Sequence, residues 1–273
     1  MGDSRDQKSL WTTPLGILTG ITGLLIIGGL IGGLATAAIT KASKSDLNEI
    51  GFTSYRRGVT SYRQGQYQEA LNYYQQALVI YREVGDRAGE GAILHSIGET
   101  HNARQQYYQT LENYQQALVI YREVGDRAGE GAILNNIGRV YAALRQYEQA
   151  LKNYQQALVV YRNVQDRARE ESTLDNISEI GITSYRRGVT SYRQGQHQEA
   201  LNYYQQALAI YRKAGDRAWQ GATLNDIGET YRILGQYDQA LENYQQALVI
   251  HRELGDRAGE GAVLAIIKSL SDN

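Results

Sequence analysis

The chain has 273 residues, no cysteine, one proline, and 28 lysines and arginines against 29 aspartates and glutamates, which gives a formal net charge of −1. The absence of cysteine excludes disulfide frameworks, thiolate metal sites and cysteine nucleophiles. The near-neutral charge gives no support to a nucleic-acid binder, which usually carries a basic excess. Hydrophobic residues at 42% and charged residues at 21% are typical of a folded chain.

The first 45 residues differ in composition from the rest of the chain. A short polar tail, residues 1–13, precedes an uncharged stretch from Leu15 to Thr40 that follows the only proline, Pro14. A helix of these 26 residues would be ~39 Å long, enough to cross a hydrocarbon core of ~30 Å. The sequence therefore predicts a single transmembrane helix over residues 14–40, followed by a linker at residues 41–45.

Two other interpretations of the apolar stretch stay open. A signal peptide would be cleaved after Ala37, although its apolar region would exceed the usual ~7–15 residues. The stretch could also form an interfacial or pore-forming segment. The basic residues on its two sides slightly favour a cytoplasmic position for the rest of the chain.

Small residues spaced four apart allow membrane helices to pair closely, although glycine is also common in unpaired spans. The pairs that could support self-association are Gly16 and Gly20, Gly28 and Gly32, and Gly29 and Gly33.

The remaining chain is one unit repeated several times. The string YQQAL begins at Tyr74, Tyr114, Tyr154, Tyr204 and Tyr244, at spacings of 40, 40, 50 and 40 residues. A fixed period of this size indicates a solenoid, in which each unit buries its apolar face against its neighbours. A longer duplication overlies this period, because residues 49–82 recur at 179–212 with three changes.

Each unit is expected to form two helices of about 17 residues. Aspartates such as Asp126 should cap the first helix, and glycines such as Gly125 should end the second helix in a left-handed conformation. Gln165 stands where that glycine is missing and where ten additional residues enter. The segment 166–194 is therefore expected to be irregular, either one long helix or a helix with a break near Gly181.

The pattern of these units resembles the tetratricopeptide repeat. The matching residues in two of the units are Leu134, Ile137, Gly138, Tyr141, Ala150, Tyr154 and Ala157, and Leu224, Ile227, Gly228, Tyr231, Ala240, Tyr244 and Ala247. The period of 40 residues is similar to that of kinesin light chains, Pins-type scaffolds and cyanobacterial multi-repeat proteins. The resemblance implies an all-α solenoid over residues 46–273, with about five helix pairs and a C-terminal capping helix, in a bacterial protein of the kind found in cyanobacteria.

Residues that could carry catalysis or bind a cofactor do not form a recognisable constellation. His95 and His101 are six residues apart, which does not suit a metal pair on one helix face. The glycine-rich GDRAGEG segments lack both the preceding strand and the lysine of a phosphate loop. The sequence therefore predicts no enzyme, no cofactor and no metal site.

The resemblance implies that the first helices line a concave groove that binds an extended or helical peptide. Positions just beside the apolar stripe should face this groove, and they vary between units whereas the core positions repeat. Asparagine amides there could hydrogen-bond a peptide backbone, and tyrosines could supply apolar area with a polar end. The candidate groove residues are Tyr55, Val59, Tyr62, His95, Glu99, Asn102, Asn135, Arg139, Tyr185, Val189, Tyr192, Asn225, Glu229 and Arg232.

The favoured hypothesis is a membrane-anchored scaffold or adaptor that binds a protein or peptide partner, in the manner of a membrane-complex assembly factor. One alternative is a membrane-active or signalling protein whose glycine-rich helix oligomerises under control of the repeats. A second alternative is a periplasmic or secreted adaptor released by signal cleavage. No nucleic-acid partner is expected.

Overall fold

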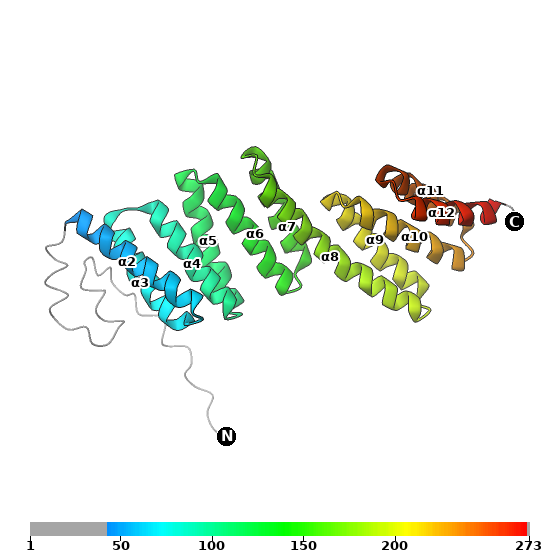
Figure 1. Cartoon of the computed structure of the whole chain (residues 1–273). Helices are drawn as coiled ribbons and strands as arrows, with labels where there is room; N and C mark the ends of the chain where they lie inside the picture. The colour runs from blue at the N-terminus through cyan, green and yellow to red at the C-terminus, as the bar shows by residue number, and fades with distance from the viewer. Residues whose placement is uncertain (1–42, 272–273) are drawn as a thin grey trace, which may run out of the picture. The chain divides into compact units, whose positions relative to one another are not determined.

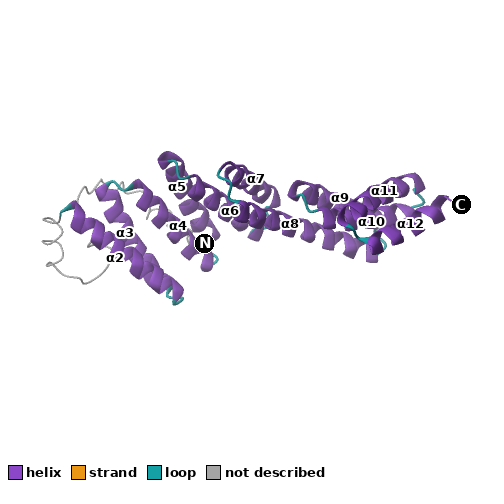
Figure 2. Ribbon diagram, turned by 45° about the horizontal axis from the view of Figure 1, so that its top comes forward, coloured by secondary structure: helices purple, strands orange, loops and turns teal. Residues whose placement is uncertain are grey.

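The computed structural model describes residues 43–271, and this part of the chain consists of helices joined by short turns, without strands (Figures 1 and 2). The helices of the described part are α2 (Lys44–Arg63), α3 (Tyr67–Val84), α4 (Arg87–Ala103), α5 (Tyr107–Val124), α6 (Arg127–Ala143), α7 (Tyr147–Asn163), α8 (Arg167–Arg193), α9 (His197–Ala214), α10 (Arg217–Ile233), α11 (Tyr237–Leu254) and α12 (Arg257–Ser271). The prediction of an all-α chain of helix pairs is confirmed.

The chain divides into two compact units, Met1–Ile120 and Tyr121–Asn273, with the boundary inside α5. In the first unit, α2 packs against α3, and α3 packs against α4. In the second unit, each helix from α6 to α12 packs against the next one along the chain. The helix α2 begins at Lys44, behind a capping box formed by Ser43 and Asp46.

No helix between residues 43 and 271 is long and apolar enough to cross a membrane. The predicted transmembrane helix at 14–40, its three glycine pairs and the alternative cleavage site at Ala37 lie outside the described residues.

Aspartates and glycines mark the ends of the helices as the sequence predicts. Asp86, Asp126, Asp166, Asp216 and Asp256 each accept a hydrogen bond from the backbone N–H three residues later, at 2.8–3.1 Å. Gly85, Gly125, Gly215 and Gly255 end the preceding helices with φ of 69–73°. Gln165 adopts the same left-handed conformation, with φ of 58°, although it has a side chain.

The two helices of a pair cross closely because a glycine faces a tyrosine. A Cβ atom on Gly138 would lie 2.6 Å from two ring carbons of Tyr154, which is itself 2% exposed. Alanines at the same crossing, Ala150 and Ala157, are completely buried. The same contact recurs between Gly58 and Tyr74, Gly98 and Tyr114, Gly188 and Tyr204, and Gly228 and Tyr244. The small residues of the repeat are therefore required by close helix contact.

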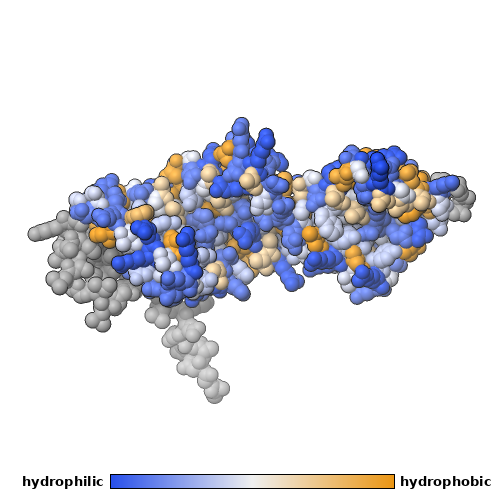
Figure 3. All heavy atoms as spheres, viewed as in Figure 1, coloured by the Kyte–Doolittle hydropathy of each residue, from blue (hydrophilic) through white to orange (hydrophobic). Residues whose placement is uncertain are grey.

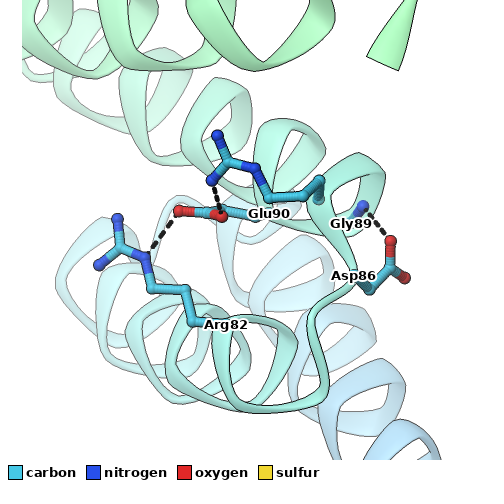
Figure 4. A network of polar contacts seen from close by, with 5 residues as sticks. Arg82, Asp86, Gly89 and Glu90 are labelled. Atoms are coloured by element: carbon cyan, nitrogen blue, oxygen red, sulfur yellow. Dashed lines mark hydrogen bonds and ion pairs between the residues drawn. The ribbon is translucent and has the colours of Figure 1, made fainter. Parts of the chain in front are cut away.

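A glutamate links four of the second helices to the helix that follows, and it is buried in two of these four copies (Figure 4). Glu90 is 5% exposed, and its carboxylate accepts hydrogen bonds from Arg82 at 2.7 Å and from Arg87. This contact is an ion pair across the turn. The contact recurs between Arg122 and Glu130, Arg162 and Glu170, and Arg252 and Glu260, each at 2.7 Å.

Burial raises the pKa of Glu130, but the hydrogen bonds and charges of Arg122 and Arg127 outweigh burial and leave its pKa below the ordinary value. In the remaining copy, Gln220 replaces the glutamate and donates to the carbonyl oxygen of Tyr211 at 3.0 Å.

The segment 166–194 contains one continuous helix, α8, of 27 residues, so the alternative of a break near Gly181 is excluded. Ile177 and Ile180 in its first half pack with residues of α7 and with the end of α9. Tyr185 and Val189 in its second half pack against the core between α9 and α10. The ten additional residues therefore extend the first helix of this pair by ~15 Å instead of forming a loop.

Candidate ligand-binding surface

The predicted groove residues occupy three equivalent positions in each first helix. They lie three residues before, one residue after and four residues after the glycine that contacts the tyrosine of its pair. Spacings of four and three residues place such positions on one helix face. We call these fourteen residues, of which α6 contributes two, the variable face, because their amino acids differ between neighbouring repeats while the glycine and tyrosine do not; only the copied helices α2 and α8 share the same three.

The variable face is more buried than a free groove would be. Only Glu99, Arg139 and Arg232 are exposed, and the other members are half-buried. In the first unit, Tyr55, Val59 and Tyr62 pack against the core of α3 and α4. Sequence reasoning thus identified which residues share a face but not how far they enter the core.

The two asparagines expected to receive a peptide already bond other helices. The Oδ1 atom of Asn135 accepts hydrogen bonds from Thr173 at 3.2 Å and from Asn176 at 3.1 Å, both on α8. Asn225 donates to Nε2 of His251 at 2.9 Å. The expectation that these amides stand free for a peptide backbone is therefore corrected, because they connect neighbouring helices.

His251 completes a buried polar chain beside Asn225. This histidine replaces a tyrosine of the other repeats and is 8% exposed. Its Nδ1 atom contacts Oδ2 of Asp256 at 2.8 Å. The Oδ1 atom of Asn225 is buried and has no hydrogen-bond partner among the described residues. His251 therefore links α10 to the N-cap of α12 through hydrogen bonds.

An aromatic and acidic group lies where α8 meets α10. Tyr185 donates to Asp226 at 2.5 Å, and its ring lies 5.1 Å from Trp219 and 5.5 Å from Tyr204. Burial raises the pKa of Asp226 above its ordinary value, against the opposite effect of the Tyr185 hydrogen bond. Burial also raises the pKa of Tyr185. Asp226 and Trp219 were not among the predicted residues, although Trp219 is the one tryptophan within the repeated GDRAGEG pattern.

Charged members of the variable face differ in whether they are paired. Arg232 donates two hydrogen bonds to Glu229, at 2.7 and 2.6 Å, and Tyr244 donates a third to the same carboxylate. The hydrogen bonds from Arg232 lower the pKa of Glu229. Burial acts in the opposite direction but is weaker, so the pKa stays below its ordinary value. Glu99 lies 3.6 Å from His95. Arg139 is exposed and forms no ion pair within residues 43–271.

On the face seen in Figure 3, hydrophobic residues lie in small separate groups among hydrophilic ones. This face has no single large apolar area. Between residues 43 and 271, acidic residues and histidines form no group of three that could hold a metal ion.

Paired helices, a glycine–tyrosine crossing in every pair and aspartate caps on the first helices from α4 onward define a helical-repeat protein. The chain belongs to the tetratricopeptide repeat family, whose profile matches residues 50–107, 89–163 and 179–253. Proteins of this family generally act as protein-interaction scaffolds. No curated protein matches the chain significantly.

Several solved structures are similar to this chain. BtubC from P. vanneervenii is 21% identical, with 77% of this chain and 83% of that chain covered and a TM-score of 0.44. Aspartyl phosphate phosphatase F from Bacillus subtilis is 19% identical, with 85% and 57% covered and a TM-score of 0.46. A putative kinesin light chain from Podosopora anserina is 20% identical, with 76% and 97% covered and a TM-score of 0.41.

Proposed function

We propose that this protein is a membrane-anchored scaffold that binds a protein or peptide partner on its variable face. The observation that supports the proposal is the contrast between positions on the same helices. Residues at the helix crossings are nearly identical in every repeat, as packing requires. The residues of the variable face, in contrast, range from tyrosine and valine to glutamate and arginine. Selectivity for a partner belongs to those positions.

Arg139 and Glu99 are the members best suited to a direct test, because both are exposed and their substitution removes little packing. Arg139→Glu and Glu99→Lys should each weaken capture of the partner from solubilised membranes. Loss of an interface anchor commonly costs ~1–2 kcal/mol, which is roughly five- to thirtyfold in affinity. Quantitative mass spectrometry of the captured proteins would measure the loss.

Matched controls reverse a charge on the second helix of the same pair. Lys152→Glu on α7 and Glu112→Lys on α5 change equally exposed residues outside the variable face. Both controls should capture partners as the unchanged protein does. If Arg139→Glu and Glu99→Lys retain every partner at wild-type levels, the variable face is not the recognition surface.

The uncharged stretch from Leu15 to Thr40 supports membrane anchoring. Full-length protein should remain in the pellet when membranes are washed with alkaline carbonate. Recovery in the supernatant with a new N-terminus at Ala38 would refute the anchor and favour a cleaved signal peptide. We also propose that the repeats lie on the cytoplasmic side, so protease added outside intact cells should leave them uncut.

A further inference from the structure

A cleft of about 730 Å³ opens between the turn that joins α6 to α7, the second half of α8 and the first half of α9. Residues lining it include Arg145 from the turn, Tyr147 at the start of α7, Arg186 and Arg187 from α8, Gln194 at the C-cap of α8, and Tyr203 from α9. None of these residues belongs to the variable face. We call this feature the arginine cleft.

The additional length of α8 accounts for the arginine cleft. The first half of α8 packs with α7, and its second half packs with α9 and α10. The α6–α7 turn therefore faces the part of α8 that extends beyond its contact with α7. The first helices α4, α6 and α10 have 17 residues and lack such an extension. The cleft is a consequence of the ten extra residues, so the regular repeat does not contain it.

The arginine cleft carries positive charge that the chain does not neutralise. Three arginines line it, against one glutamate, Glu199, which accepts a hydrogen bond from Ser191 at 3.2 Å. Arg187 lies over the ring of Tyr203, 5.9 Å from its centre, and none of the three arginines forms an ion pair within the described part of the chain. Arg122 and Arg162, in contrast, are paired with glutamates. Free guanidinium groups at one cleft are a site for carboxylates.

Arg145 occupies a backbone position that favours glycine. Its φ is 59°; three of the equivalent turns have Gly65, Gly195 and Gly235 at φ of 73–75°, and the fourth has Gln105 at φ of 58°. A residue with a side chain is strained in this conformation, and such strain is often found at functional sites. An arginine at this turn thus places a third charge beside Arg186 and Arg187 at the expense of local stability.

We propose that the arginine cleft binds a carboxylate-rich, extended segment of a partner protein. The lining along α8 runs from Thr183 to the C-cap residue Gln194, twelve residues that cover ~16 Å of helix. An extended segment of about five residues has that length. Threonine and glutamine side chains along the cleft can bond its backbone. A chain with net charge −1 lacks the basic excess of a nucleic-acid binder, and a glutamate within the lining does not favour an anionic bilayer.

The test measures binding of fluorescein-labelled hexaglutamate to the full-length chain in neutral detergent, by fluorescence polarisation at low salt. Arg186→Gln/Arg187→Gln should weaken binding about tenfold or more, because two charge-assisted contacts are lost. The matched control is Arg56→Gln/Arg57→Gln. It changes the same Tyr-Arg-Arg-Gly sequence in the first copy of the duplication, and α2 has no extended first half like that of α8. The control should change binding by no more than about twofold.

A second variant separates binding from folding. Arg145→Gly should weaken hexaglutamate binding while raising the denaturation midpoint, because glycine relieves the left-handed residue. A role in stability alone would not produce these opposite changes.

Three results would overturn the proposal. The first is an equal loss of binding in the two double variants. The second is binding of hexaglutamate no tighter than that of labelled hexaglutamine. The third is loss of binding to phosphatidylserine vesicles in Arg186→Gln/Arg187→Gln with unchanged hexaglutamate binding, which would assign the cleft to a membrane surface.

Discussion

Replacing Gly138 with alanine should destabilise the chain, although alanine is the better helix former. The added Cβ would lie 2.6 Å from Cδ1 and Cε1 of Tyr154, well inside van der Waals contact. Tyr154 is 2% exposed, so its ring has no free space into which to move. Overpacking of this kind costs ~1–3 kcal/mol, whereas the helix preference of alanine over glycine returns only ~1 kcal/mol. The expected net loss is ~1–2 kcal/mol.

Gly261 provides a matched control for this substitution. It lies inside α12, and a Cβ atom there would have no neighbour within 4 Å. Gly261→Ala should therefore stabilise the chain by up to ~1 kcal/mol, from helix preference alone. The same chemical change should have opposite signs at the two positions.

Urea denaturation followed by far-ultraviolet circular dichroism would measure both effects. Because repeat proteins can unfold in segments, the comparison uses midpoints recorded under identical conditions. If Gly138→Ala raises the midpoint as Gly261→Ala does, the helices of this pair do not cross as closely as described. The assignment of the repeated glycine to the helix crossing would then be refuted.

Three further substitutions can be followed by the same measurement. Gln165→Gly should stabilise the chain by ~0.5–1 kcal/mol, because residue 165 has a left-handed backbone conformation that glycine adopts without strain. Gly125→Gln should destabilise the chain by a similar amount for the same reason. Equal denaturation midpoints for the two variants would contradict the turn geometry. Glu130→Gln should cost ~1–2 kcal/mol at neutral pH. This contribution is present above the ordinary glutamate pKa and is lost as the pH falls through the lower folded pKa, so the variant should match the wild type in acid. Ala157→Leu should cost ~1–3 kcal/mol by overpacking, and an unchanged midpoint would refute its place in the core.

Much of the fold could be predicted because its signals are local. An aspartate caps the helix that begins one residue later, and a glycine ends the helix directly before it, so a few neighbouring residues are enough to locate a turn. The crossing of Gly138 and Tyr154 lies within one helix pair, sixteen residues apart. Contacts over such short separations repeat with the sequence and are visible in it.

The candidate surface could be predicted only in part because its burial depends on contacts between repeats. Asn135 is bonded to Thr173 and Asn176, about forty residues later, and this contact depends on how successive first helices align. The continuity of α8 also lacks a local signal, since Gly181 in its middle could equally mark a break. In the structure, Gly181 lies against the ring of Tyr211, where a larger residue would not fit.

The 130-residue duplication shows how strongly the surroundings determine the role of a residue. Ile50 and Ile180 occupy equivalent positions in nearly identical sequences, yet Ile50 is 41% exposed and Ile180 is 3% exposed. Ile180 is covered because α8 continues backward onto α7, whereas the described part of α2 begins at Lys44, six residues before Ile50. By the same argument, Arg186 and Arg187 line a cleft opposite the α6–α7 turn, although Arg187 lies over the ring of Tyr203 just as its copy Arg57 lies over the ring of Tyr73. A copied sequence can therefore acquire a new binding surface without changing its own residues, when an insertion changes what it faces.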